Sequence, residues 1–327
     1  MTERRAAMLA WLKSVLHDLE LTVQSASSDA SFRSYWRVFT QDRSYVVMDA
    51  PPDLEETGNF VRIARQLREI GLNTPEIYAQ SHEAGFLLMS DLGTCQYLGH
   101  LTEHSVERLY GDALGALVTL QACGPVHGLP DYDAPLLRRE LELFREWLLG
   151  WHLGLTLSRA ETSILETTFA RLIDNALEQP RVCVHRDYHS RNLMVTGAPS
   201  PGVLDFQDAV VGPVTYDLVS LLRDCYIAWP EERVREWSDG YFHLAVQSGI
   251  FRPGHAEYFR AWFDLMGMQR HLKAAGIFAR LKHRDGKRGY LGDIPRTLSY
   301  VIGVARSYPE LIEFGAFVEK RVYAALR

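Results

Sequence analysis

The side chains best suited to chemistry gather a little beyond the middle of the chain. His185 and Asp187 are followed by Asn192, and Asp205 comes after a further turn-rich stretch. This spacing is typical of a phosphoryl-transfer loop, in which an aspartate accepts the proton of the acceptor hydroxyl and an asparagine holds a metal. Such chemistry depends on positioning and on neutralisation of phosphate charge by Mg²⁺. We therefore predict Asp187 as the catalytic base and Asn192 and Asp205 as Mg²⁺ ligands.

A hairpin would bring the two predicted metal ligands together. Two short apolar runs, 193–195 and 202–204, flank a segment rich in glycine and proline. That pattern predicts two strands joined by a turn. Asn192 and Asp205 would then lie at the same end of the hairpin. The alternative is a surface loop in which these side chains only cap turns.

Composition indicates an ordinary folded protein whose partners are small molecules. The 327 residues are 47% hydrophobic, and this length suggests two domains. A net charge of -6 argues against a general nucleic-acid binder. The four cysteines form no metal-binding or paired pattern, and no apolar run is long enough to cross a bilayer. We predict a cytoplasmic monomer that binds neither nucleic acid nor a membrane.

Residues 1–91 predict a strand-rich lobe that binds a nucleotide. Apolar residues at helical spacing within 1–20 indicate a first helix rather than a signal peptide. A second helix is predicted at 53–70, with Asp53 as its N-cap. The predicted strands are 21–24, 32–39, 45–48, 77–79 and 86–89.

A loop of small residues, 25–31, lies between the first two predicted strands. Backbone N–H groups in such a loop can approach phosphate oxygens, and Ser28 or Ser31 could add hydroxyl donors. An ordinary hairpin loop is the alternative, since glycines are missing. The strand that would carry a phosphate-pairing lysine has none, so Arg33 and Arg37 are the nearest cationic substitutes.

The break after the last of these strands is a candidate site for adenine. Backbone groups of a linker in this position can bind the edge of the base, while apolar side chains enclose the ring. The predicted linker residues are Met89, Ser90, Asp91 and Leu92.

Residues 92–327 predict a mainly helical lobe that carries the catalytic loop and the acceptor site. The expected helices are 103–123, 133–152, 159–177, 216–229 and 256–281, and a basic stretch at 282–288 is expected to be an exposed loop. The fold class is therefore α+β and bilobal, with a small antiparallel sheet and a helix in the first lobe.

Several polar residues are assigned to the acceptor or to support of the loop. Arg270 and Lys273 share one helix face and would suit an anionic or neutral polar acceptor, unless that face is merely solvated. Asp217 could brace the catalytic loop by accepting hydrogen bonds from its backbone or from His185, or it could only complement a helix dipole. The remaining residues assigned to the acceptor are His189, Arg191 and Gln207.

Taken in order, these motifs resemble the aminoglycoside phosphotransferase family, most strongly at 185–208. The resemblance implies a protein-kinase-like fold, ATP with Mg²⁺, and the roles given above to Asp187, Asn192 and Asp205. Segments 28–33, 47–52 and 269–278 look like those of bacterial cell-wall sugar kinases within that family.

This narrower likeness implies phosphorylation of N-acetylmuramate and N-acetylglucosamine at the anomeric hydroxyl during peptidoglycan recycling. The family also acts on aminoglycosides, choline and homoserine, so these acceptors remain alternatives. A pseudokinase-like binding module is a further alternative, because the phosphate-pairing lysine is missing.

Overall fold

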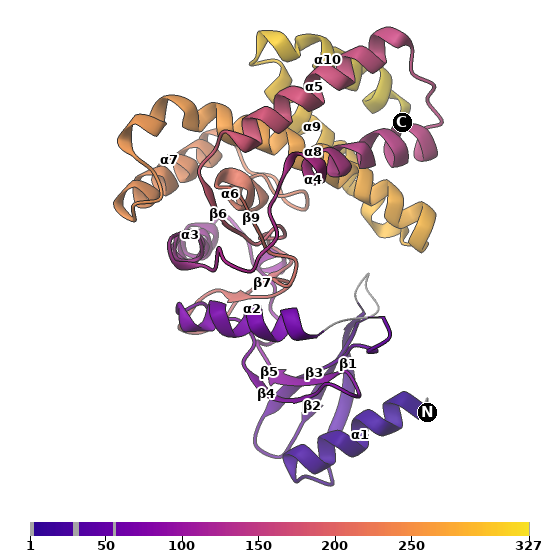
Figure 1. Cartoon of the computed structure of the whole chain (residues 1–327), viewed down its shortest axis with the longest axis vertical. Coiled ribbons are helices and arrows are strands. Elements are labelled where there is room, and N and C mark those ends of the chain that lie inside the picture. Colours follow the sequence, from indigo (N-terminus) through magenta and orange to yellow (C-terminus); the bar gives the residue numbers. More distant parts are fainter. Residues whose placement is uncertain (1–2, 29–32, 55–56, 327) are drawn as a thin grey trace. The chain divides into compact units, whose positions relative to one another are not determined.

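The computed structural model describes residues 3–28, 33–54 and 57–326. Its packing divides the chain into two compact units (Figure 1). Unit 1 comprises Met1–Asp112 and Asn192–Gln207, and unit 2 comprises Ala113–Arg191 and Asp208–Arg327. Unit 1 contains an antiparallel sheet and unit 2 is mostly helical, which confirms the predicted α+β class. The functional boundary after residue 91 stays a prediction.

A five-stranded antiparallel sheet forms the centre of unit 1. Its order is β1-β2-β3-β5-β4, so β3 lies in the middle. Trp36 lies opposite Val47, which in turn lies opposite Leu88, and this register places alternate residues of three strands on one face. The strands are β1 (Thr22–Ser28), β2 (Ser34–Phe39), β3 (Ser44–Asp49), β4 (Ile77–Ser81) and β5 (Phe86–Ser90).

Helix α1 (Glu3–Leu16) covers this face of the sheet (Figure 1). Its Met8 and Leu12 are fully buried and pack in one cluster with Val47 and Leu88. Asp49 points to the same side, where it accepts a 2.6 Å hydrogen bond from Nε of Arg4. Asp49, the last residue of the strand β3 that has no lysine, therefore helps to attach α1 to the sheet.

Helix α2 (Gly58–Glu69) begins later than the predicted residue 53. The preceding segment forms a turn, in which the Leu54 N–H donates to the Pro51 carbonyl at 2.9 Å. The prediction that Asp53 caps the helix is therefore wrong, and Thr57 holds the N-cap position without a side-chain hydrogen bond. Phe60, Ile63, Ala64 and Leu67 form its apolar stripe, and all four are buried.

The predicted hairpin after the catalytic loop is confirmed and belongs to unit 1. Strands β7 (Leu193–Met194) and β8 (Gly202–Val203) pair antiparallel. The Val195 N–H donates to the Cys95 carbonyl at 2.7 Å, and the Val203 N–H donates to the Asn73 carbonyl at 2.8 Å. Backbone bonds to both sides thus join the hairpin to a segment about a hundred residues earlier in the chain.

Unit 2 is built around the 30-residue helix α8 (Ala256–Asp285), which is buried along most of its length. The division of the sequence between Asp112 and Ala113 falls within helix α3 (Val106–Cys123). The other elements are α4 (Ala134–Leu143), a π-helical continuation (Phe144–His152), α5 (Arg159–Leu177), β6 (Arg181–Val184), β9 (Val210–Pro213), α6 (Thr215–Leu222), α7 (Glu231–Gln247), α9 (Ile294–Ala305) and α10 (Ile312–Phe317).

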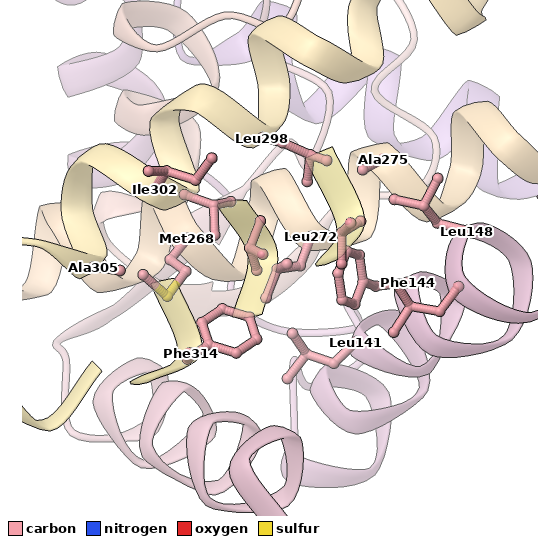
Figure 2. Packing of buried hydrophobic residues seen from close by; sticks show 14 of the residues in the cluster. Leu141, Phe144, Leu148, Met268, Leu272, Ala275, Leu298, Ile302, Ala305 and Phe314 are labelled. Atoms are coloured by element: carbon pink, nitrogen blue, oxygen red, sulfur yellow. The ribbon is translucent and has the colours of Figure 1, made fainter. Parts of the chain in front are cut away.

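Figure 2 shows how side chains of several helical segments meet in the core of unit 2. Met268 and Leu272 of α8 lie among Phe144, Leu298 and Phe314 from the surrounding helices. Close approach of α8 to α4 requires a glycine. A Cβ atom added at Gly276 would lie only 2.3 Å from the carbonyl carbon of Leu143, so any side chain would separate the two helices.

Two predicted boundaries in unit 2 are wrong. The helix expected at 216–229 ends at Leu222, because Asp224 leaves the helical path and accepts the Tyr226 N–H at 2.9 Å. The basic stretch expected to be a loop instead continues α8 as far as Asp285, where Gly286 ends the helix with a φ of 70°. None of the helices in the described ranges has the length and apolarity needed to span a membrane.

Candidate active site

The catalytic loop of unit 2 is held at its start by two neighbouring elements. Strand β6 pairs with β9, which fixes the chain up to Val184. The buried carboxylate of Asp217, on α6, then accepts the N–H groups of His185 at 2.6 Å and Arg186 at 3.0 Å. Arg186 has a φ of 76°, a conformation that non-glycine residues seldom adopt. Asp217 therefore bonds to the backbone where the loop makes its sharp turn.

Asp217 predicts a pH dependence of catalysis. Burial raises its pKa from 3.8 to about 6, although the two backbone donors oppose that shift. Below this pH the carboxyl gains a proton, and one oxygen can no longer accept a backbone N–H. We expect kcat at saturating substrate to fall as pH decreases through about 6. Steady-state rates measured between pH 4.5 and 8 would show this acidic limb of the pH–rate profile.

Asp217→Asn is the matched control for that limb. The amide does not titrate in this range and cannot accept both N–H groups as a carboxylate does, so the variant should be slower at every pH and its limb near pH 6 should disappear. A limb that persists unchanged in Asp217→Asn would belong to the nucleotide or to another group, and would contradict the assignment.

Asp187 presents a partly exposed carboxylate on this loop. Its side chain is 42% exposed, whereas the neighbouring His189 side chain is 11% exposed. Burial alone would raise the pKa of Asp187, but the positive charges of Lys273 and Arg270 outweigh burial and hold that pKa below its usual value. Burial lowers the pKa of His189 to about 4, so His189 is neutral near pH 7. Asp187 is thus an ionised, accessible proton acceptor.

Glu140 of α4 is a buried carboxylate that sequence reasoning missed. It accepts hydrogen bonds from the guanidinium of Arg186 and the hydroxyl of Tyr132, and lies 2.9 Å from Nζ of Lys273. Lys273 also donates to the Tyr216 hydroxyl at 2.8 Å. One carboxylate therefore neutralises two of the cations that lower the pKa of Asp187.

The predicted acceptor residues on α8 have partners inside unit 2. Arg270 is 5% exposed, and its Nη1 lies 3.4 Å from the Cys225 thiol. Lys273 is 8% exposed and is engaged by Glu140 and Tyr216, as described above. The alternative of a solvated helix face is therefore wrong, because both cations are buried.

Arg191, at the end of the loop, lies between two aromatic rings. Its guanidinium carbon is 4.7 Å from the ring centre of Tyr226 and 5.2 Å from that of Tyr290. Ser190 just before it donates its N–H to Asp224 at 2.9 Å, and its hydroxyl bonds to the same carboxylate oxygen. Hydrogen bonds at Ser190 and aromatic contacts at Arg191 therefore fix this end of the loop.

Unit 1 brings the two predicted metal ligands together. The amide nitrogen of Asn192 lies 3.1 Å from one carboxylate oxygen of Asp205, and Gln207 donates to the other at 2.8 Å. Asp205 has a φ of 64°, so its backbone is constrained. A carboxylate and an amide oxygen form a donor set that fits Mg²⁺, which typically uses few protein ligands and completes its shell with phosphate oxygens and water. Gln207, assigned to the acceptor, contacts Asp205.

The predicted adenine linker is held by Arg37 of β2. Its Nε and Nη2 bond to the two oxygens of Asp91 at 2.6 and 3.0 Å, and Nη2 also reaches the Gly93 carbonyl at 2.8 Å. The Gly93 N–H donates back to Asp91 at 2.9 Å. Arg37, considered above as a phosphate ligand, is therefore committed to the linker. Ser90 pairs through its N–H and hydroxyl with the backbone of Glu76.

Replacing Arg37 tests whether this ion pair shapes the linker. Arg37→Met would leave the nearly buried Asp91 carboxylate without its bidentate partner, which should lower stability by about 1 to 3 kcal/mol. We expect the KM for nucleotide to rise about 3- to 10-fold, because a looser linker binds the base less well, while kcat changes little. Arg43→Met, on an exposed turn of the same sheet, is the control. Unchanged nucleotide KM in Arg37→Met would contradict this role.

The remaining predicted nucleotide ligands are only partly described. Ser31 and the Ser28 side chain lie outside the described residues, while Arg33 is half-buried just before β2. Met89 is buried within β5, and Leu92 is half-buried after it.

Known proteins resemble this chain over most of its length. The model of the phosphotransferase enzyme family matches residues 22–258. The N-acetylmuramate/N-acetylglucosamine kinase of Pseudomonas putida is 46% identical, with 96% of each chain covered. The protein of the same name from Pseudomonas aeruginosa is 49% identical over 89% of this chain and 86% of its own.

A solved structure agrees on the fold. The GDP complex of aminoglycoside 2'-phosphotransferase-IIIa superposes with a TM-score of 0.61 at 15% identity, covering 94% of this chain and all of that one. This likeness confirms the predicted protein-kinase-like fold. Together with the family match, it leads to one conclusion: the chain belongs to the phosphotransferase enzyme family.

Proposed function

We propose that this protein is a sugar kinase that phosphorylates the anomeric hydroxyl of N-acetylmuramate and N-acetylglucosamine, as one step of peptidoglycan recycling. The observation that carries the proposal is the 46% identity, over 96% of both chains, to a Pseudomonas putida protein named as a kinase of these two sugars. The catalytic loop described above has the groups that this reaction requires.

Asp187 acts as the proton acceptor in this proposal. The acceptor hydroxyl oxygen attacks the γ-phosphorus, the bond from that phosphorus to the β–γ bridging oxygen breaks, and the nucleoside diphosphate leaves. The hydroxyl proton passes to the Asp187 carboxylate. The low pKa of Asp187 keeps it ionised at neutral pH, and its 42% exposed side chain is open to a substrate.

Asn192 and Asp205 would hold Mg²⁺ when nucleotide binds, and the bound ion would supply positive charge to the phosphate oxygens. Gln207 orients the Asp205 carboxylate through its 2.8 Å hydrogen bond, and the hydrogen bonds of Asp217 keep the start of the catalytic loop in place. ATP is the proposed donor, with its base against the linker 89–92 and its phosphates near the loop at 25–31.

The reacting part of the acceptor is oriented by His189 and Arg270. His189 and Arg270 are nearly buried beside Asp187, and a neutral imidazole suits a sugar hydroxyl. Lys273 acts through the charge it places near Asp187, since its ammonium bonds to Glu140 and Tyr216. Because the reaction consumes a nucleoside triphosphate, the proposed location is the cytoplasm, where the protein acts as a monomer.

A panel of acceptors tests the proposal. The protein is incubated with Mg²⁺ and ATP and, separately, with each of the two N-acetyl sugars, choline, homoserine and kanamycin. Phosphorus NMR of the products should show an anomeric phosphate doublet from the two sugars. Turnover confined to aminoglycosides or amino alcohols would overturn the proposed acceptor. Absence of both ADP release and an Mg²⁺-ATP effect on the melting temperature would favour a binding module without activity.

A further inference from the structure

The cations of unit 2 near Asp187 differ in whether a carboxylate already neutralises their charge. Lys273 lies 2.9 Å from a Glu140 oxygen, and Arg186 bonds to the same carboxylate. Arg270 is nearly buried against a thiol. A fourth cation, Arg191, is half-exposed and stands four residues after the proposed base. Arg191 is therefore the cation of the loop most accessible to a ligand.

Arg191 has no carboxylate partner within ion-pair distance among residues 3–28, 33–54 and 57–326. Asp293, whose charge contributes to raising the pKa of Arg191, is instead bonded to Arg296 at 2.9 Å. The hydroxyl of Tyr226 is its hydrogen-bond partner, which leaves other donors of the guanidinium for a ligand. A partly desolvated guanidinium without a counter-ion favours an anion.

The guanidinium is also oriented before any ligand arrives. Tyr226 and Tyr290 flank it, and stacking on ring faces leaves the N–H groups pointing outward in the guanidinium plane. Asp224 links the two sides of this arrangement, since one oxygen accepts the Ser190 N–H and the other accepts the Tyr226 N–H, each at 2.9 Å. The backbone before Arg191 and the backbone of its aromatic neighbour are thus tied to one carboxylate.

A planar donor that is oriented in this way binds a planar anion best. A carboxylate can accept two parallel N–H bonds from a guanidinium, whereas an acetamido group or a hydroxyl cannot match that geometry and charge. The two sugars named above differ at one position in this respect, because N-acetylmuramate carries a lactyl ether that ends in a carboxylate and N-acetylglucosamine carries a hydroxyl there.

We propose that Arg191 binds the lactyl carboxylate of N-acetylmuramate and sets the preference between the two sugars. This inference rests on the proposed function. The sequence analysis assigned Arg191 to the acceptor without a specific role, and expected Arg270 and Lys273 to suit an anionic or neutral polar acceptor. Those side chains are buried in unit 2, whereas Arg191 combines accessibility, an uncompensated charge and a fixed orientation.

The test compares both sugars in Arg191→Met, which retains an apolar stem between the two rings. We expect kcat/KM for N-acetylmuramate to fall about 10- to 100-fold, as for loss of a charge-assisted hydrogen bond, while the value for N-acetylglucosamine changes less than about 3-fold. Arg191→Lys should be intermediate, because it restores charge without the bidentate geometry. Activity on N-acetylglucosamine shows in the same sample that the variant is folded.

An uncharged substrate and a control variant complete the test. The methyl ester of N-acetylmuramate removes the substrate's charge, so it should be a poor substrate of the wild type and should lose no more in Arg191→Met. Arg233 of α7 provides a matched control, since it lies between Trp229 and Trp237 at 5.3 and 5.0 Å from their ring centres. Arg233→Met should leave the ratio of the two sugars unchanged.

Specific outcomes overturn the inference. If kcat/KM fell equally for both sugars in Arg191→Met, or fell for neither, Arg191 would not bind the lactyl carboxylate. A rise in the KM for nucleotide with both sugars would assign Arg191 to a phosphate instead. Failure of the wild type to phosphorylate either sugar would refute the proposed function itself, which is a separate result.

Discussion

Replacement of Asp187 by asparagine is expected to lower kcat by about 10²- to 10⁴-fold, the usual cost of losing a proton acceptor. The substitution keeps the shape of the side chain and removes its charge. The amide cannot take the hydroxyl proton, although the surrounding hydrogen bonds of Asp217 to the loop backbone stay in place. Steady-state kinetics with saturating ATP and N-acetylglucosamine measure the loss.

A measurement of nucleotide binding shows whether a lower rate in Asp187→Asn results from loss of the base or from unfolding. Asp187→Asn should retain the increase in melting temperature that the wild type shows with Mg²⁺-ATP, because no part of the proposed nucleotide linker is changed. Asp174→Asn, at an exposed position of α5, is the matched control and should keep full activity. Near-normal turnover in Asp187→Asn would rule out Asp187 as the base.

Replacement of Asp205 by asparagine is expected to lower kcat by about 10²- to 10³-fold, comparable to the loss of a group that stabilises transition-state charge. The carboxylate is the only charged member of the proposed metal pair, and an amide binds a hard cation less tightly. The concentration of Mg²⁺ needed for half-maximal rate should rise at the same time. A titration of rate against Mg²⁺ at fixed ATP measures both effects.

Gln207 provides a graded comparison for that experiment. Gln207→Ala removes the 2.8 Å hydrogen bond that orients Asp205 but leaves the carboxylate itself, so its effects should have the same direction and be smaller. If Asp205→Asn left the Mg²⁺ dependence unchanged, the role of Asp205 as a metal ligand would be contradicted, even if kcat fell.

Local signals account for the elements that could be predicted from sequence. Helix α5 matches its predicted range, Arg159–Leu177, and its start is marked by a capping box in which Ser158 and Glu161 bond to each other's backbone. Asp53 offers a similar polar residue before an apolar stripe, yet the chain there turns at Pro51 instead. A cap residue indicates a helix start only when the backbone around it can become helical.

Long-range contacts explain what sequence could not supply in the site. The spacing of Asp187 and Asn192 is local and therefore visible, whereas Glu140 meets Arg186 and Lys273 only after helices distant in sequence have packed. One signal was present. Glu140 lies on the buried stripe of α4 between Leu137 and Leu141, where an unpaired carboxylate would be costly, so a cationic partner could have been expected.

The same reasoning explains why the alternative of a solvated face on α8 is wrong. Gln269, Arg270, His271 and Lys273 are consecutive or nearly so, and a polar run normally indicates a solvated face. All four are buried here, because α8 is surrounded and each side chain meets a partner on another element, such as the Arg223 carbonyl for His271 at 2.8 Å. Burial on all sides cannot be inferred from one helix alone.

Unit 1 receives its last two strands late in synthesis. Residues 1–112 leave the ribosome first, but the backbone of Asn73 and Cys95 is paired by the hairpin of 192–207. A nascent chain that stops before residue 192 would leave those groups unpaired and would lack both Asn192 and Asp205. We infer that unit 1 completes its folding only after most of the chain has emerged, so a fragment of residues 1–112 should fold poorly unless the hairpin is supplied separately.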